Sequence, residues 1–216
     1  MMKKKFKITG GVYLVLDPAM PESLLLQKLE AALHGGLSAL QIWNNWTEGT
    51  DKFKLIEAIA ALCSPYDVPL FINEDWQLLM TTSFIDGVHF DTIPANYNSI
   101  IASVGRPFMA GITCSGDLDT VRWANEQQLD YVSFCAMFPS PSAGTCDIVM
   151  PATVRHARSI TTIPIFVSGG ITPSNLVTLK KETPFDGVAV ISGILSADEP
   201  QQQVQTYKDA LGINNQ

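Results

Sequence analysis

Apolar stretches and helix-like patterns alternate along this chain from beginning to end. Residues 12–16 form a near-continuous apolar run that ends at Asp17-Pro18, and apolar residues at helical spacing follow from about Pro21 as far as Gly35-Gly36. A continuous run of this kind is typical of a strand that is buried on both faces. The pattern therefore predicts a strand that is followed directly by a helix.

The same unit recurs along the rest of the chain. Further strands are predicted at 39–42, 70–72, 87–90, 108–112, 131–134, 165–167 and 188–191. The helices that follow them are predicted at 51–63, 75–82, 98–104, 117–127, 151–159, from 173 onward, and near 199–211. Eight alternations favour a closed (β/α)8 TIM barrel over an open doubly wound sheet, which usually has fewer strands. Because no linker interrupts them, residues 1–216 are predicted to be a single domain, with 1–10 as a basic N-terminal extension.

Composition narrows the class of partner. The 216 residues are 46% hydrophobic and 16% charged with a net charge of −7, which fits a compact domain and argues against nucleic acid as a partner. The basic start MMKKKFK has no apolar stretch behind it, so neither a signal peptide nor a membrane span is predicted and a cytoplasmic location is expected. Four cysteines without a C-x-x-C pair are interpreted as buried apolar residues rather than as disulfides or zinc ligands, namely Cys63, Cys114, Cys135 and Cys146.

Polar residues gather where the predicted strands end. In a barrel these carboxyl ends surround one mouth, which is where function is expected. The resulting ring is acidic and rich in hydroxyl groups, and it consists of Asp17, Gln41, Trp43, Asn45, residues 73–75, His89, Asp91, Thr113, Ser115, residues 138–142, residues 168–170, Ile191 and Ser192.

Two small-residue turns near the end of the chain predict a phosphate site. Gly169-Gly170 ends the seventh strand, and Thr172 and Pro173 have the residue types of a helix N-cap and a first helical residue. Ser192-Gly193 ends the eighth strand in the same way. Main-chain N–H groups at two adjacent turns of this kind can bind one phosphate, and the loops after strands seven and eight commonly do so in such barrels.

Two carboxylates from neighbouring units indicate a metal site. Glu74 and Asp91 follow the third and fourth strands, so they can converge on a hard cation such as Mg²⁺, which needs only one or two protein carboxylates. The alternative is that Glu74 and Asp75 cap the following helix. Both interpretations stay open at this point.

The chain resembles the thiamine-phosphate synthase family, whose barrel is similar to that of the thiazole tautomerase group. The resemblance covers nearly the whole chain, and its strength lies in the order and spacing of the motifs. They are V-Y-L-V-L-D, A-L-H-G-G-L-S-A-L-Q-I, V-P-L-F-I-N-E-D, D-G-V-H, M-F-P-S-P-S, S-G-G-I-T-P and D-G-V-A-V-I-S. The tautomerases are expected to use a His after the sixth strand, where Ala136 stands here, and this argues against their activity.

The resemblance implies a transferase of thiamine biosynthesis. An aminopyrimidine-methyl pyrophosphate would lose pyrophosphate, and the ring nitrogen of a thiazole phosphate would capture the cation. Mg²⁺ and positive groups would stabilise the departing charge. The partners are then small phosphorylated substrates, and a homodimer is left open. The implied metal ligands are Glu74 and Asp91, and the implied substrate contacts are Gln41, Asn73, Thr113, Ser140, Ser142, Gly170, Ile191 and Ser192.

Three cations of the family pattern are missing. Its Gln-x-Arg-x-Lys reads here with Trp43 and Asn45 in place of Arg and Lys, and Ala143 stands where the loop after the sixth strand normally carries a Lys. A site without these cations stabilises a pyrophosphate leaving group poorly. The alternatives to a synthase are therefore a divergent paralogue that binds a thiazole phosphate or a related phosphorylated metabolite without synthase activity, and a non-catalytic partner protein.

Several other side chains have two interpretations each. His89 can be a general base or a structural hydrogen-bonding residue. Trp43 and Trp46 can stack on an aromatic ligand or simply cover the mouth of the barrel. Lys180 and Lys181 are interpreted as charges at a helix C-terminus rather than as ligand contacts.

Overall fold

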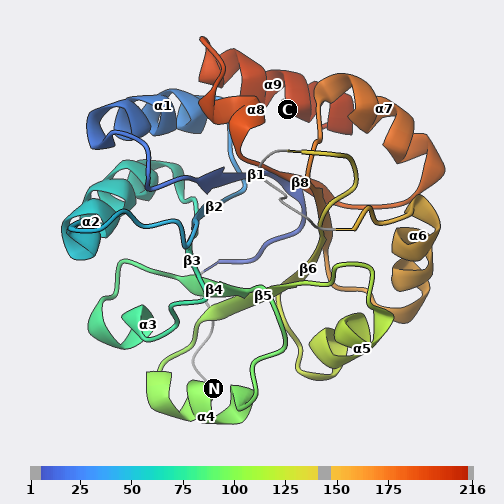
Figure 1. Cartoon of the computed structure of the whole chain (residues 1–216), viewed down its shortest axis with the longest axis horizontal. Helices are drawn as coiled ribbons and strands as arrows, with labels where there is room; N and C mark the ends of the chain where they lie inside the picture. Colours follow the sequence, from blue (N-terminus) through green and yellow to red (C-terminus); the bar gives the residue numbers. More distant parts are fainter. Residues whose placement is uncertain (1–5, 141–146, 214–216) are drawn as a thin grey trace.

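Eight parallel strands close into one barrel in the order β1 to β8, with helices around the outside (Figure 1). The computed structural model describes residues 6–140 and 147–213. The strands are β1 Gly11–Leu16, β2 Ala39–Ile42, β3 Leu70–Asn73, β4 Gly87–Phe90, β5 Met109–Thr113, β6 Tyr131–Phe134, β7 Ile165–Ser168 and β8 Gly187–Val190. The pairing of β8 with β1 closes the sheet, so the predicted TIM barrel is confirmed.

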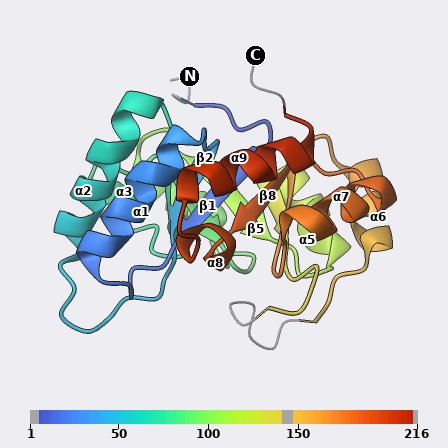
Figure 2. The ribbon, with the colours of Figure 1, turned by 90° about the horizontal axis from the view of Figure 1, so that it is seen from above.

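The helices form a layer around the strands (Figure 2). They are α1 Glu22–His34, α2 Lys52–Cys63, α3 Leu78–Thr81, α4 Tyr97–Val104, α5 Leu118–Glu126, α6 Pro151–Ile160, α7 Pro173–Glu182, α8 Ser192–Leu195 and α9 Pro200–Leu211, with a 3-10 turn, η1, at Ser64–Tyr66. The last helix, α9, packs beside both α1 and α7, and it thereby joins the two ends of the helical layer.

Most predicted elements agree with the structure to within a residue or two, and α3 and α8 are the exceptions. The helix predicted at 75–82 is reduced to Leu78–Thr81, because Glu74 has a positive φ of 59° and tight turns occupy the residues after it. The short helix α8 was not predicted. It begins at Ser192, directly after β8, where a simple turn was expected.

The strands separate two apolar regions. Alternate residues of each strand point to opposite faces. In β1, Val12, Leu14 and Leu16 belong to the large core between barrel and helices, while Tyr13 and Val15 belong to a smaller cluster inside the barrel. The inner cluster thus fills the barrel below its mouth.

Four aromatic rings dominate this inner cluster, and we call Tyr13, Phe71, Tyr131 and Phe166 the ring layer. Tyr131 lies 5.5 Å from Tyr13, 5.6 Å from Phe71 and 5.4 Å from Phe166 between ring centroids, each in an edge-to-face arrangement. Glycines on neighbouring strands make room for the rings. A Cβ at Gly111 would lie 2.0 Å from the Tyr131 ring.

Candidate active site

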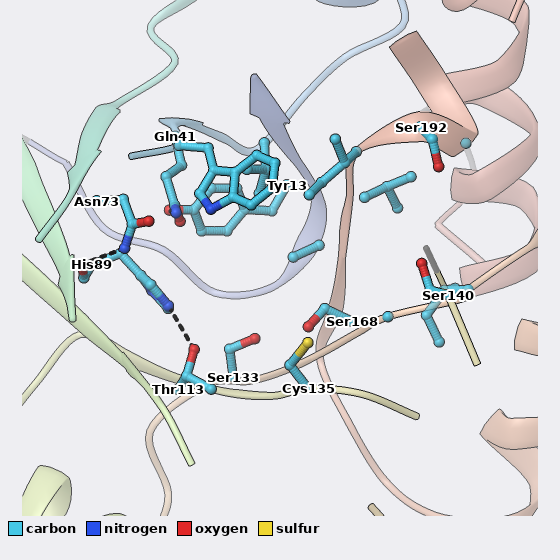
Figure 3. A pocket seen from close by; sticks show the side chains of 18 of the residues that line it. Tyr13, Gln41, Asn73, His89, Thr113, Ser133, Cys135, Ser140, Ser168 and Ser192 are labelled. Carbon is cyan, nitrogen blue, oxygen red and sulfur yellow. Dashed lines mark hydrogen bonds between the residues drawn. The ribbon is translucent and has the colours of Figure 1, made fainter. Parts of the chain in front are cut away.

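A cavity with both polar and apolar walls opens above the ring layer, at the carboxyl ends of the strands (Figure 3). The sequence-predicted residues that line it are Gln41, Asn73, Asp91, Thr113, Ser140, Gly170, Ile191 and Ser192, together with Trp43 and His89. Glu74 lies behind Asp91 rather than in the cavity wall. Ser142 and Ala143, on which two further predictions depend, lie outside the described residues.

The two ends of the cavity differ in chemistry. Gln41 and Asn73 present side-chain amides at one end, and Ser140 and Ser192 lie together at the other, beside the turns after β7 and β8 (Figure 3). In the described part of the chain no Lys or Arg lines the cavity. An extended ligand with a heterocycle at one end and an anionic group at the other would match this division.

At the amide end, Asn73 holds three loops together. Its Nδ2 donates to Asp91 Oδ1 over 3.0 Å and to the main-chain oxygen of His89 over 3.3 Å, and its Oδ1 accepts from the Asn44 main-chain N–H. Buried amides are stable only when bonded in this way. Asn73 therefore fixes the position of the exposed Asp91 carboxylate at the rim.

The predicted metal carboxylates are neighbours. Glu74 Oε1 accepts the main-chain N–H of Asp91. Burial raises the pKa of Glu74, the bond from Asp91 N–H acts against the rise, and the negative charge of Asp91 adds to it. A bound cation would relieve this repulsion, but the described residues contain no group of three or more His, Cys, Asp or Glu that could hold one, so the Mg²⁺ site stays a prediction.

Asp75 has a partner elsewhere. Its carboxylate accepts a hydrogen bond from Lys52 Nζ over 3.1 Å, and the same ammonium group lies 5.1 Å from the centre of the Trp46 ring. Lys52 is the first residue of α2 and comes directly after the loop that lacks the family cations. A positive charge is thus present at this rim, although it does not line the cavity.

The turn after β7 is built from two glycines in the left-handed region of backbone conformation. Gly169 and Gly170 have positive φ values of 79° and 64°, and a Cβ at Gly170 would lie 2.6 Å from the Pro139 main-chain oxygen. The loop after β6 packs directly against this turn because neither residue has a side chain. Thr172 then caps α7 in a capping box with Asn175.

The turn after β8 lies beside it. Ile191 is the N-cap of α8, and Ser192 and Gly193 are its first residues. Gly170, Ile171, Ser192 and Gly193 all line the cavity. The first N–H groups of a helix have no partner within the helix, and the predicted phosphate site at the two turns stays a prediction.

Four of the polar residues that line the cavity were not foreseen. Tyr131, Ser133 and Cys135 come from β6 and the residue after it, and Tyr13 comes from β1. A usable signal was present in the period of two along a strand. Because Tyr131 points into the barrel, Ser133 and Cys135 must follow on the same face.

A chain of hydrogen bonds runs beneath the cavity. Tyr13 OH donates to Gln41 Oε1 over 3.1 Å and lies 2.8 Å from Tyr131 OH. Tyr131 OH is 2.8 Å from His89 Nδ1, and His89 Nε2 is 2.9 Å from Thr113 Oγ1. Both imidazole nitrogens are therefore occupied, which supports the structural interpretation of His89 over the general base.

Burial makes His89 the main acid-sensitive group of this network. Desolvation lowers the pKa of His89 to about 4, with the charge of Asp91 acting in the opposite direction. Because the pKa of His89 in the folded protein lies below its ordinary value, the unfolded chain binds this proton more tightly than the folded protein does. The free energy of unfolding therefore falls as the pH falls. Between pH 7 and pH 5, in chelator-treated buffer, we expect the unfolding free energy measured in urea to fall by about 2 kcal/mol.

Matched variants isolate this effect. His89→Gln is expected to flatten the pH dependence, while His34→Gln, on the exposed face of α1, is expected to leave it unchanged. Equal slopes for the wild type and His89→Gln would contradict the assignment.

Trp43 and Trp46 have different surroundings. Trp43 lines the cavity, whereas Trp46 packs against the outer core and beside Lys52. Only Trp43 is therefore placed to touch a ligand. Lys180 donates to the main-chain oxygen of Leu211, in agreement with a helix-end role. Cys63 and Cys114 are buried free thiols.

A closed barrel with a cavity at the carboxyl ends of its strands defines this chain as a protein of the TIM-barrel class, in which active sites lie at this end. A family model described as thiamine monophosphate synthase matches residues 12–194. The chain therefore belongs to the thiamine monophosphate synthase family.

Individual relatives agree with this assignment. A thiamine-phosphate synthase of Nitrosococcus oceani is 31% identical over 92% of this chain and 91% of its own length. One of Thiobacillus denitrificans is 32% identical over 88% and 89%. Among solved structures, a thiamine phosphate pyrophosphorylase from Pyrococcus furiosus superposes with a TM-score of 0.80 at 18% identity, covering 95% of this chain and 96% of that one, which supports the fold.

Proposed function

We propose that this protein is a thiamine-phosphate synthase, a transferase that joins an aminopyrimidine-methyl pyrophosphate to a thiazole phosphate and releases pyrophosphate. Family membership supports the reaction. The observation that carries the proposal is a single cavity with amide side chains at one end and two glycine-containing turns at the other. The proposal treats residues 1–216 as one domain with a basic extension at 1–10.

The substrates take opposite ends of the cavity. Main-chain donors at Gly170, Ile191 and Ser192, with the hydroxyls of Ser140 and Ser142, bind the phosphate of the thiazole. Gln41, Asn73 and Thr113 bind the pyrimidine. The indole of Trp43 forms part of the wall and gives the aromatic rings an apolar surface on which to stack.

Asp91 and Glu74 hold Mg²⁺ in this proposal. The cation supplies positive charge that neutralises the departing pyrophosphate. Asp91 contributes an exposed carboxylate at the cavity, and Asn73 keeps this carboxylate in position through the Nδ2–Oδ1 hydrogen bond. Glu74 orients the same loop from behind by accepting the Asp91 N–H.

Lys52 supplies part of the positive charge that Trp43 and Asn45 no longer provide. Its ammonium group is held at the rim by Asp75, two residues beyond the cavity residue Asn73, and its side chain is 36% exposed. Lys52→Ala is expected to raise the KM of the pyrophosphate substrate about tenfold, the size of one charge-assisted hydrogen bond. The KM of the thiazole phosphate should stay unchanged.

Lys54 offers a matched control on the same helix. Its side chain is exposed, and its Nζ lies 3.9 Å from Glu22 Oε1. Lys54→Ala is expected to retain wild-type kinetics. An equal rise of the KM for the pyrophosphate substrate in both variants would assign the effect to the general charge of α2 and remove Lys52 from the proposal.

The proposed activity is tested by mixing the purified protein with both precursors and Mg²⁺ and assaying pyrophosphate. We expect release that depends on both substrates and stops with chelator. A triple variant, Trp43→Arg, Asn45→Lys and Ala143→Lys, is expected to be faster. No release from either protein, with thermal stabilisation by thiazole phosphate alone, would favour a paralogue that binds a phosphorylated metabolite without synthase activity.

A cytoplasmic location and a homodimeric assembly belong to the same proposal. Free thiols at Cys63 and Cys114 support a reducing compartment. In the described residues no helix is long and apolar enough to cross a membrane. Sedimentation of the purified chain at micromolar concentration tests the dimer, which a monomer mass would exclude.

A further inference from the structure

The hydrogen-bonded chain from Gln41 to Thr113 has a fixed direction. Burial raises the pKa of Tyr13 and of Tyr131 far above the usual range, so each phenol keeps its single hydrogen. The hydroxyl of Tyr13 donates its hydrogen to Gln41 Oε1. The hydrogen in the 2.8 Å bond between the two phenols must then come from Tyr131.

The hydrogens in the remaining bonds, from Tyr131 to Thr113, can be assigned in the same way. Since Tyr131 has given its hydrogen to Tyr13, the 2.8 Å bond to His89 requires a hydrogen on Nδ1. At pH 8 even an ordinary imidazole is neutral, so Nε2 carries a lone pair. Thr113 therefore donates to Nε2, and the Thr113 oxygen faces the cavity with acceptor capacity only.

A turned-over Gln41 amide would reverse every bond in this chain. Gln41 Nε2 would donate to Tyr13, Tyr13 to Tyr131, Tyr131 to Nδ1 of His89, and Nε2–H to Thr113. In one order the cavity sees N–H donors of Gln41 and an acceptor at Thr113, and in the other it sees the opposite. The hydrogen bond that Tyr13 OH donates to Gln41 Oε1 selects the first of these two orders.

We propose that Tyr13, Tyr131 and His89 are positioning residues that couple Gln41 to Thr113, so that this cavity selects a heterocycle with one acceptor and one donor on opposite sides of its ring. A 4-aminopyrimidine has this pattern, because its exocyclic amino group lies across the ring from a ring nitrogen. The inference rests on the proposed function for the identity of the ring, but the ordered chain of bonds is a property of the protein alone.

The order is tested by ¹⁵N NMR of the histidine side chains at pH 8, without any substrate. The wild type is expected to carry the His89 hydrogen on Nδ1. In Tyr13→Phe, Tyr131 has no acceptor at position 13 and turns its hydrogen to Nδ1, so the His89 hydrogen is expected to move to Nε2. A His89 tautomer that is the same in both proteins overturns the inference.

Tyr97→Phe is the control, because Tyr97 belongs to α4 and packs against Phe90 and Trp123 outside the barrel. This variant is expected to keep the wild-type tautomer. If the His89 tautomer also changed in Tyr97→Phe, the change would reflect a general disturbance of the structure, and the proposed coupling through the hydrogen-bonded chain would be overturned.

Kinetics give a second readout that a merely structural role would not move. Tyr13→Phe is expected to raise the KM of the aminopyrimidine substrate about tenfold and to leave that of the thiazole phosphate within twofold. Equal changes in both would overturn the positioning role. If no turnover is found in any protein, the proposed function fails, while the NMR result still tests the order of the hydrogen-bonded chain.

Discussion

Gly170→Ala is expected to abolish tight phosphate binding and to lower the unfolding free energy by about 3 kcal/mol. Gly170 has a φ of 64°, which a residue with a Cβ adopts only with strain. The new methyl group would also lie 2.6 Å from the Pro139 oxygen and 2.8 Å from the Phe138 oxygen. Because both neighbours are main chain, the turn itself must move, and its N–H groups move with it.

A calorimetric titration with thiazole phosphate and urea unfolding measure the two effects. Gly105 provides the matched control, because its φ of 65° is nearly the same but a Cβ there would meet nothing within 4 Å. Gly105→Ala should lower the unfolding free energy by only about 1 kcal/mol, from backbone strain alone, and should bind thiazole phosphate normally. If both variants bind phosphate equally well, the turn after β7 is not the phosphate site.

The barrel was predictable because its signal is periodic and repeated. Each strand reads as a short apolar run, and each helix that follows has its own apolar spacing, so eight weak indications support one another. Residue types that favour helix ends were also reliable indicators. Thr172 and Pro173 mark the start of α7, and the observed capping box confirms that prediction.

Elements that depend on a single turn were harder to foresee. The four residues of α8 are too few to show a helical period, and Ser192-Gly193 reads equally well as a plain turn. The shortened α3 depends on the positive φ of Glu74, a conformation that its residue type does not indicate.

The site was predictable in part for the same reasons. Residues directly at strand ends, such as Gln41 and Thr113, line the cavity as expected because parallel strands all end at one mouth. What the sequence leaves open is which neighbours touch. The contact of Lys52 with Asp75 and the bond from Tyr13 to Gln41 join residues that are 23 and 28 positions apart.

The ring layer connects stability to recognition. Tyr131 takes part in the hydrogen-bonded chain through its hydroxyl and in the inner core through its ring. Gly111 lies opposite it in the paired strand β5 and leaves the space that the ring fills. A change at Gly111, which offers no functional group, should therefore reach both Gln41 and Thr113.

Gly111→Ala is accordingly expected to lower the unfolding free energy by about 3 kcal/mol, the upper end for overpacking, because the added Cβ would lie 2.0 to 2.5 Å from three atoms of the buried Tyr131 ring. Urea unfolding measures the loss, and the KM of the aminopyrimidine substrate should rise at the same time. Tyr131→Leu in the same background removes the clashing ring, so the double variant should be more stable than the two single losses add up to. Strict additivity would show that the methyl group and the ring do not compete for this space, and the link between the ring layer and the cavity would then be lost.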